Sequence, residues 1–411
     1  MNQPSLSLRA LAGLLLGALA PAVAPGLLPA QQVVQIPAGD RVLQPRIAPV
    51  FSVGREDGAD WETFSGVRQV AFDDADNLYV LDKGSASIYV FRPNGRFLRQ
   101  IGKKAGGPGE LLNPLQFAVT RDGMVVVSDL GRRAFSVFGV DGSFKRNVPY
   151  EGQGGLSLSG LRMRAGPRGG VFLTSQGLPG LSPAAGGVGI VRQQFDGRSA
   201  PARIFQAPAD PSPGGARRTG GATVVSNQRP AFSPEVSWGV LPDGGIAVAY
   251  TADYAVRIVS PAGAVTRVVR RGIAPRRVTE ADRTAMRERR TAQMAGGGNV
   301  TVVGGSSNPQ VQALVREALA STVRDMEFAD VVPVIQTIAT DRAGTVWIQR
   351  SGRQVGASGP IDLVTPAGRY VGTLAGQRVP DAFSPTGRVA YIEKDDMEVE
   401  RVVVRQLPPR W

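Results

Sequence analysis

The stretch that decides the fold is VAFDDADNLYVLD, residues 70–82, together with the similar FAVTRDGMVVVSD, residues 117–129. Each consists of an apolar strand, a turn that contains Asp or Gly, and a second apolar strand. Four further copies follow: MRAGPRGGVFLT (163–174), WGVLPDGGIAVAY (238–250), IATDRAGTVWIQ (338–349) and DAFSPTGRVAYIE (381–393). Such recurrence indicates a repeat architecture.

Five of the six copies are followed by a second strand–turn–strand element whose turn ends in Gly. These turns lie at Gly95, Gly142, Gly197, Gly263 and Gly368. The spacing between the two turns of a unit is 19 residues from Gly123 to Gly142, and again from Gly244 to Gly263. Two hairpins per unit, with Asn-Gly and Asp-Gly pairs that tolerate positive φ, predict four-stranded blades.

Successive first turns are separated by one blade. From Asp76 to Gly123 there are 47 residues, and from Gly123 to Gly169 there are 46, within the range of propeller repeats. The intervals that end at Gly244 (75 residues) and Gly344 (100 residues) are longer, so each holds a blade and an insertion. The sequence therefore predicts an all-β, six-bladed β-propeller of four-stranded blades. Five blades, or an open array, is the alternative.

The sixth copy lacks a clear outer strand, since residues 402–407 supply only its third strand. The segment RIAPVFSV, residues 46–53, is a strand without a partner ahead of the first copy. We expect this segment to close the ring as the outer strand of the last blade, because closure hides strand edges that would otherwise pair with other chains.

The units resemble the NHL-type repeat of six-bladed propellers. The resemblance rests on LYVLDKGSASIYVF (78–91) and VVVSDLGRRAFSVF (125–138), which have that repeat's order of strand, Asp, small turn and strand. Asp82 and Asp129 occupy the family's Asp position, and their matched places favour a structural role in bonding the next backbone turn. The resemblance implies the fold. It says little about activity, because such propellers include binding scaffolds, sensors and a few enzymes.

Residues 1–30 have the order of a secretory signal peptide: a polar start with Arg9, the apolar run LAGLLLGALA (11–20), and then small residues. Cleavage after Ala24 or after Ala30 fits that pattern, and an uncleaved anchor is the alternative. The apolar run is too short to span a bilayer comfortably, and no later segment predicts a membrane helix. We expect an exported protein, periplasmic or extracellular, with residues 31–411 as the propeller.

The composition excludes several kinds of chemistry. The 411 residues include no Cys and no His, so disulfides, zinc–thiolate sites, Cys nucleophiles and His-based triads are impossible. Propeller lyases of the streptogramin type depend on His, so we expect those activities to be absent.

The net charge of +13 indicates either a basic surface for an anionic partner or an Arg bias from GC-rich coding. The basic residues are scattered and form no nucleic-acid tract.

Two stretches depart from the repeat. Residues 175–230 are rich in Gly, Pro, Ser and Ala and predict surface loops, with a substrate lid as the alternative. Residues 276–330 predict a helical insertion between blades four and five. Thr279 caps its first helix with Asp282 three residues on, and Asn308 and Pro309 begin a second helix with an apolar stripe. The insertion is a cap over one propeller mouth or a partner-docking arm, or else a helix packed against the propeller's side.

No constellation of residues predicts catalysis. The carboxylates cluster in hairpin turns, where they usually form the turn: Asp73, Asp74 and Asp76 in one, Asp395 and Asp396 in another. We predict no catalytic residue, no metal ligand and no cofactor, and the ligand-binding residues stay unassigned. The predicted function is a monomeric, non-enzymatic binding scaffold that takes a protein or glycan at a propeller mouth, and no nucleic acid. The alternative is a divalent-metal-dependent hydrolase of the lactonase type.

Overall fold

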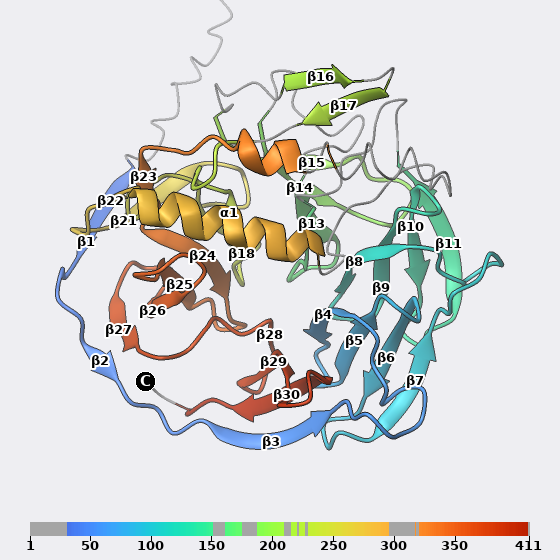
Figure 1. Cartoon of the computed structure of the whole chain (residues 1–411). Helices are drawn as coiled ribbons and strands as arrows, with labels where there is room; N and C mark the ends of the chain where they lie inside the picture. Colours follow the sequence, from blue (N-terminus) through green and yellow to red (C-terminus); the bar gives the residue numbers. More distant parts are fainter. Residues whose placement is uncertain are drawn as a thin grey trace, which may run out of the picture. The chain divides into compact units, whose positions relative to one another are not determined.

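The computed structural model describes residues 31–150, 161–174, 187–208, 215–219, 222–226, 229–295, 317 and 320–409. The predicted signal peptide, residues 1–30, and its cleavage site lie outside the described residues. The remaining unit is Gln31–Trp411, in which each copy of the repeat forms one blade and six blades surround a central axis (Figure 1). The predicted six-bladed propeller is confirmed, and the five-bladed and open alternatives are wrong.

Each blade is a sheet whose strands follow one another from the axis outward. The first three blades comprise β4 (Val67–Phe72), β5 (Leu78–Asp82), β6 (Ser87–Phe91) and β7 (Phe97–Ile101); β8 (Pro114–Val119), β9 (Val125–Asp129), β10 (Ala134–Phe138) and β11 (Phe144–Pro149); and β12 (Met163–Ala165), β13 (Val171–Thr174), β14 (Gly189–Gln193) and β15 (Ala202–Gln206).

The last three blades comprise β18 (Ser237–Val240), β19 (Ile246–Ala249), β20 (Ala255–Val259) and β21 (Val265–Arg271); β24 (Ile335–Thr340), β25 (Val346–Ser351), β26 (Ser358–Val364) and β27 (Tyr370–Leu374); and β28 (Ala382–Phe383), β29 (Arg388–Lys394), β30 (Glu400–Gln406) and β3 (Ala48–Val53).

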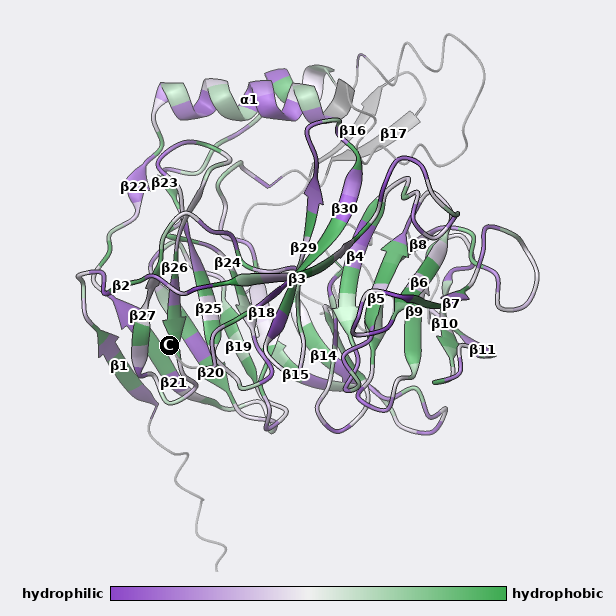
Figure 2. Ribbon diagram, turned by 90° about the horizontal axis from the view of Figure 1, so that it is seen from below, coloured by the Kyte–Doolittle hydropathy of each residue, from purple (hydrophilic) through white to green (hydrophobic). Residues whose placement is uncertain are grey.

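The hydrophobic core consists of layers between neighbouring blades. The two middle strands of a blade face neighbours on both sides, which is why β5, β6, β9 and β10 are buried along their whole length and read as nearly continuous apolar runs. One buried cluster joins blades one and two through Leu81 and Val125. Another joins blades six and one through Val404 and Val70, so the packing continues around the ring. The green strands of Figure 2 show this core.

The hairpin turn after each inner strand has the same geometry. In all six blades the backbone N–H of the first turn residue bonds the carbonyl four residues later, as from Thr120 to Met124. Gly123 has φ of +82°, and a Cβ there would lie 2.8 Å from the Val140 side chain. Asp76 holds the same place in blade one with φ of +60°, a conformation that Asp tolerates better than most residues. The six turns are therefore equivalent positions of the repeat.

The N-terminal segment closes the ring, as predicted. Strand β3 pairs antiparallel with β30, with Val53 opposite Val402. Two further strands were not predicted: β1 (Gln32–Ile36) adds parallel to β21, and β2 (Val42–Leu43) adds parallel to β27. Blades four and five therefore have five strands, and the N-terminal arm, residues 31–53, follows the outside of blades four, five and six (Figure 1).

A buried ionic cluster holds this arm. The Arg271 and Asp362 side chains, both without exposed surface, form an ion pair of 2.7 Å. Arg271 also donates to the carbonyls of Pro37 (2.9 Å) and Gly39 (2.7 Å) and pairs with Asp40 at 2.7 Å. The cluster thus fastens the loop between β1 and β2 to blades four and five.

The helical insertion begins as predicted. Helix α1 (Glu280–Ala295) follows Thr279, whose N–H donates to Asp282 Oδ2 at 2.9 Å, and Asp282 N–H bonds Thr279 Oγ1 at 3.3 Å. The short strands β22 (Arg276–Arg277) and β23 (Val331–Val332) pair at the base of the insertion. Residues 320–324 are helical, whereas the predicted start of the second helix, at Asn308 and Pro309, lies outside the described residues.

The loops predicted for residues 175–230 also contain regular structure, and β14 and β15 of blade three lie within this range. Strands β16 (Gly215–Thr219) and β17 (Ala222–Ser226) form a hairpin there. The residues after this hairpin meet the helical insertion: the Ala231 N–H donates to the Glu327 carbonyl at 2.7 Å, and the Phe232 ring lies 6.2 Å from that of Phe328. The two insertions are therefore joined. No helix among the described residues is long and apolar enough to cross a membrane.

The two mouths of the propeller differ. Because a blade has four antiparallel strands, the chain leaves each blade at the mouth where it entered, and all blade-to-blade connections share one mouth. Helix α1 lies across this mouth, beyond the strand ends (Figures 1 and 2), rather than against the outer side of a blade. We call it the α1 mouth. The opposite end, the turn mouth, is framed by the six five-residue turns that follow the inner strands.

Candidate functional site

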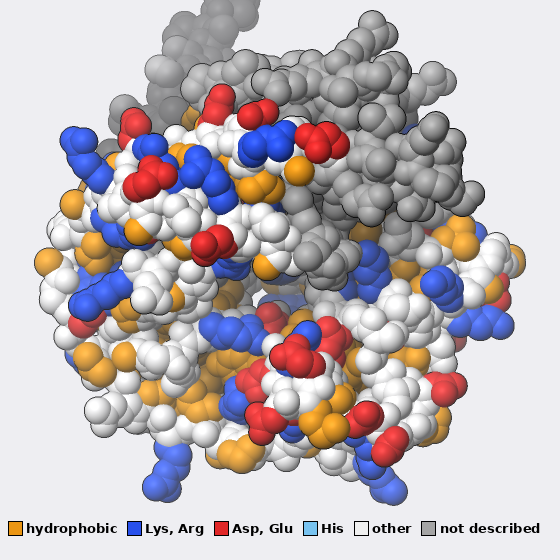
Figure 3. Space-filling view, in the orientation of Figure 1, with side chains coloured by type: hydrophobic (Ala, Val, Ile, Leu, Met, Phe, Trp, Pro, Cys, Tyr) orange, Lys and Arg blue, Asp and Glu red, His pale blue; other side chains and the backbone are white. Residues whose placement is uncertain are grey.

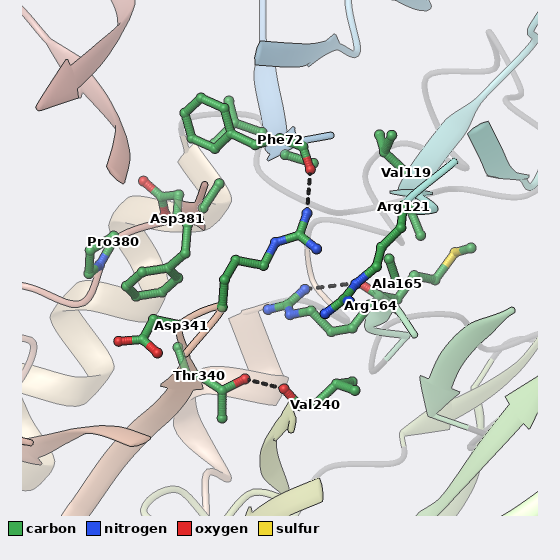
Figure 4. A pocket seen from close by; sticks show the side chains of 18 of the residues that line it. Phe72, Val119, Arg121, Arg164, Ala165, Val240, Thr340, Asp341, Pro380 and Asp381 are labelled. Carbon is green, nitrogen blue, oxygen red and sulfur yellow. Dashed lines mark hydrogen bonds between the residues drawn. The ribbon is translucent and has the colours of Figure 1, made fainter. Parts of the chain in front are cut away.

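A cavity of about 160 Å³ lies on the propeller axis. Residues of all six blades line it, because the inner strands β4, β8, β12, β18, β24 and β28, or the turns beside them, border the axis. Among its polar and charged side chains are Gln69, Arg121, Arg164, Thr340, Asp341, Arg342 and Asp381. Figure 4 shows this cavity with Phe72, Val119 and Val240 on its walls.

Three arginines supply the positive charge of the cavity. Arg164 belongs to β12, and Arg121 and Arg342 lie in the turns that follow β8 and β24. Figure 4 shows the Arg121 and Arg164 side chains extending into the same space. The turns place Arg121 and Arg342 at the turn mouth, whereas Arg164 lies further along the axis toward the α1 mouth.

Arg342 is held by two partners. Its Nη2 donates to the Phe72 carbonyl at 2.9 Å, the dashed line at Phe72 in Figure 4, and its Nη1 lies 3.2 Å from Asp74 Oδ1. Burial lowers the pKa of Arg342, while the Asp74 carboxylate opposes the shift and the Arg121 charge adds to it. Arg342 is therefore a fixed cation with one carboxylate partner.

Arg164 and Arg121 have no ion pair with any carboxylate of the described residues. Arg164 donates to its neighbour, the Met163 carbonyl, at 3.0 Å. The Arg164 residue is exposed, yet the protein around its side chain lowers the pKa of Arg164 to about 10, with Arg162 adding to the shift and Asp381 opposing it. The guanidinium stays charged at neutral pH. The Nε of Arg121 is buried and has no hydrogen-bond partner among the described residues.

The two acidic residues of the cavity are already engaged. Asp341 accepts hydrogen bonds from the Thr345 N–H at 2.8 Å and from Trp347 Nε1 at 3.2 Å. Asp381 Oδ2 accepts from the Ile392 N–H at 2.8 Å and lies 2.9 Å from Arg378 Nη2. The carboxylate oxygens of Asp341 and Asp381 are thus directed to neighbouring donors, whereas Arg121 and Arg164 of the same cavity have no carboxylate ion pair among the described residues.

A contact within the helical insertion lies at the α1 mouth. The guanidinium carbons of Arg283 and Arg287 lie 5.7 and 5.0 Å from the centre of the Phe328 ring. Arg276 pairs with Asp282 and reaches the Arg353 carbonyl of blade five at 3.4 Å. Figure 3 shows this face, with both basic and acidic side chains along α1 and a hollow near its centre. Arg283 and Arg287 of α1 therefore serve contacts within the insertion.

The carboxylates singled out in the sequence support the fold. Asp82 accepts from the Ser65 and Ser85 N–H groups at 3.1 and 3.2 Å. Asp129 accepts from the N–H groups of Leu112 and Asn113 at 2.8 and 2.9 Å. Both thus bond backbone turns, as predicted from their matched positions.

The turn carboxylates behave likewise. Asp73 accepts from the N–H groups of Ala75 and Asn77, and Asp395 from those of Met397 and Val399. Asp74 and Asp76 are exceptions, because Asp74 pairs with Arg342 and Asp76 accepts a hydrogen bond from the Thr386 hydroxyl, both across blades. Within the described ranges, no group of three or more acidic residues is placed to hold a metal ion.

Sequence reasoning missed the channel arginines, although the repeat contains the signal. The position two residues before the turn Gly, or before Asp76 in blade one, points to the axis at the turn mouth. Its occupants in blades one to six are Asp74, Arg121, Pro167, Pro242, Arg342 and Pro385. Four of these line the cavity. Aligning the six copies on their turns would have shown that arginines recur at one position of the repeat, instead of being scattered.

The ring of six blades and its axial cavity define the class of protein, a six-bladed β-propeller. Within that class, residues 60–153 match the model of a family described as "6-bladed beta-propeller" (DUF5128). This stretch includes the first two blades, where the repeat is clearest. The match agrees with the observed fold and does not show the narrower NHL type. No curated protein matches the chain.

Solved structures with a similar arrangement of the chain include a predicted exported protein of Bacteroides fragilis (TM-score 0.48, 11% identity, 92% of this chain and 100% of the other). Others are a gluconolactonase of Xanthomonas campestris (0.41, 13%, 84% and 87%) and a catalytically inactive virginiamycin B lyase of Staphylococcus aureus (0.40, 10%, 89% and 99%). At these identities and TM-scores they carry no information about the activity of this chain.

Proposed function

We propose that this chain is an exported, non-enzymatic binding protein that takes a small ligand into the axial cavity of its propeller. The observation that supports the proposal is the cavity itself, which all six blades line and which lies at the point where the repeat converges. Binding sites commonly occupy such places, because side chains from several elements reach a common space. The order of residues 1–30 supports export.

The donor set does not fit the alternative of a divalent-metal-dependent hydrolase. Calcium and similar cations need several oxygen ligands that are free to coordinate. Asp341 and Asp381, the carboxylates of the cavity, are engaged by neighbouring donors, and Arg121, Arg164 and Arg342 would repel a cation. A protein or glycan at a mouth, and the monomeric state, stay predictions.

The test is a channel-blocking variant. Ala165 lines the cavity, so Ala165→Trp should fill it, whereas Ala262 lies exposed in the outer turn of blade four and Ala262→Trp is the matched control. The purified proteins are incubated with a small-molecule extract of the producing cells, and retained compounds are identified by native mass spectrometry. We expect one retained mass that Ala165→Trp loses and Ala262→Trp keeps. No retained mass in the unaltered protein, or equal retention by both variants, would contradict the proposal.

A further inference from the structure

We propose that the axial cavity binds an oxyanion, the phosphate, sulfate or carboxylate group of a small molecule, between Arg121, Arg164 and Arg342. This inference rests on the proposed function, because it assigns a ligand chemistry to the same cavity. The arginines come from blades two, three and five, so only the assembled ring brings them together.

The charge of the cavity is the first argument. Asp74 neutralises Arg342, and the other carboxylates that influence Arg342, Asp73 and Asp76, accept hydrogen bonds from their own turn and from Thr386. Arg121 and Arg164 keep their charges without a carboxylate ion pair among the described residues. Like charges facing one partly enclosed space repel each other, and an anion between them removes that repulsion.

The unused hydrogen-bond donors are the second argument. A guanidinium has five N–H donors in a rigid fork that matches the oxygens of a phosphate or carboxylate. The buried Nε of Arg121 has no acceptor among the described residues, and buried donors are normally satisfied. The only side-chain hydrogen bond of Arg164 within the described ranges goes to the adjacent Met163 carbonyl. An oxyanion would supply the missing acceptors.

The size and access of the cavity restrict the ligand. A cavity of about 160 Å³ accommodates a small molecule or the anionic end of a larger one. A polymer does not fit inside it. Arg121 and Arg342 lie at the turn mouth, the end opposite helix α1, so an anionic group can enter there while the rest of a larger ligand stays at the rim.

The experiment measures binding of inorganic phosphate by isothermal titration calorimetry, with sodium chloride added to keep ionic strength constant. We expect saturable binding of one phosphate per chain, weakened about tenfold to a hundredfold in Arg121→Gln and in Arg164→Gln, since each loses a charged hydrogen bond. The control is Arg168→Gln, which removes the same charge from the turn after β12, beside the same mouth but outside the cavity lining.

A melting experiment guards against misfolded variants. In chloride alone, Arg164→Gln should melt at the same or a higher temperature than the unaltered protein, because it relieves repulsion. Phosphate should raise the melting temperature of the unaltered protein and of Arg168→Gln, but not that of Arg164→Gln. Non-saturable binding, or equal losses in all three variants, would show general attraction to a basic protein and overturn the proposal.

The source of the anionic group is distinguished by parallel titrations with phosphate, glucose 6-phosphate, galacturonate and glucose. Tighter binding of an anionic sugar than of phosphate assigns the cavity to anionic sugars, and equal or tighter binding of phosphate assigns it to the free ion. Retention of a neutral compound in the mass-spectrometric test, unaffected by Arg121→Gln, would overturn the oxyanion while leaving the binding function intact.

Discussion

Asp129 shows how one carboxylate fixes the geometry of a blade. Its side chain is fully buried and accepts hydrogen bonds from backbone N–H groups on two sides. Leu112 and Asn113, which lead into β8, donate from one side. The N–H of Gly131, in the turn that follows β9, donates from the other at 3.0 Å. A charged acceptor of this kind satisfies several buried donors at once. The position of β8, and with it one wall of the cavity, therefore depends on this residue.

We expect Asp129→Ala to lower the free energy of unfolding by about 3 kcal/mol, because several buried N–H groups lose their acceptor. Asp129→Asn should lose less, since its amide oxygen still accepts. The measurement is urea unfolding followed by tryptophan fluorescence. The control is Asp141→Ala, in the exposed outer turn of the same blade, which should change the unfolding midpoint only slightly. Equal shifts for Asp129→Ala and Asp141→Ala would refute the role given to Asp129.

At the scale of residues, sequence reasoning succeeded where a position repeated. Asp82 and Asp129 stand at the same place in two copies, and that match predicted their backbone bonds. Arg121 and Arg342 also occupy the same position of the repeat, two residues before the turn Gly. Because arginine is common throughout this basic chain, its recurrence at that position did not stand out in the sequence. Arg164 has no counterpart in the repeat, and only the closed ring shows which residues it faces.

At the scale of elements, the helical insertion depends on its first turn. Thr279 and Asp282 bond each other's backbone N–H groups in a capping box, and Asp282 also pairs with Arg276. The Arg276 guanidinium holds the pKa of the Asp282 carboxyl well below its usual range; burial opposes this, and Thr279 adds to it. The start of α1 is thus joined to the ribbon at the base of the insertion.

We expect Asp282→Ala to speed amide hydrogen exchange in the first turns of α1, by an amount that corresponds to about 1 kcal/mol. The folded-state pKa of Asp282 lies below its ordinary value, so its contribution is complete above about pH 4 and is lost as the pH falls through the folded-state pKa. The difference in amide exchange rate between Asp282→Ala and the unaltered protein should therefore become smaller only below about pH 4. Glu288→Ala, on the exposed side of α1, is the control. Unchanged exchange in Asp282→Ala would argue against the capping role.

The N-terminal arm shows why some elements escaped prediction. Strand β3 was expected because the sixth copy of the repeat lacks an outer strand of its own. Strands β1 and β2 join blades that were already complete, and β1 buries little besides Ile36, so no alternating pattern marks it. Their position depends instead on Arg271, whose contacts with the loop between them connect residues more than 200 positions apart.

At the scale of the whole molecule, the repeat predicted the ring because each blade obeys local rules: strand alternation, turn glycines and a fixed turn spacing. The insertions obey none of these rules, and only the structure shows that they share one mouth. Their place follows from the even number of strands per blade, which returns the chain to the same end every time. The turn mouth lies at the other end, where a short turn follows each inner strand.

Two deletions should separate the parts of the arm. Removing residues 31–44 takes away β1 and β2 but keeps β3, so we expect a propeller that still unfolds in one transition, at a lower temperature. Its exposed β21 and β27 edges should favour association. Removing residues 31–53 also takes away β3 and opens the ring, so we expect loss of the cooperative transition. Calorimetry and light scattering are the measurements. If both deletions behaved alike, β3 would not be the closing strand.

The pairing of β3 with β30 also determines when, during synthesis, the ring can close. The two strands are about 350 residues apart, and at 5 to 20 residues per second roughly 20 to 70 seconds of synthesis separate them. Throughout that interval the sixth blade cannot form, and Arg121, Arg164 and Arg342 cannot yet face one another within a closed ring. A ribosome-bound chain is thus kept open by its own topology until its last strand has been synthesised.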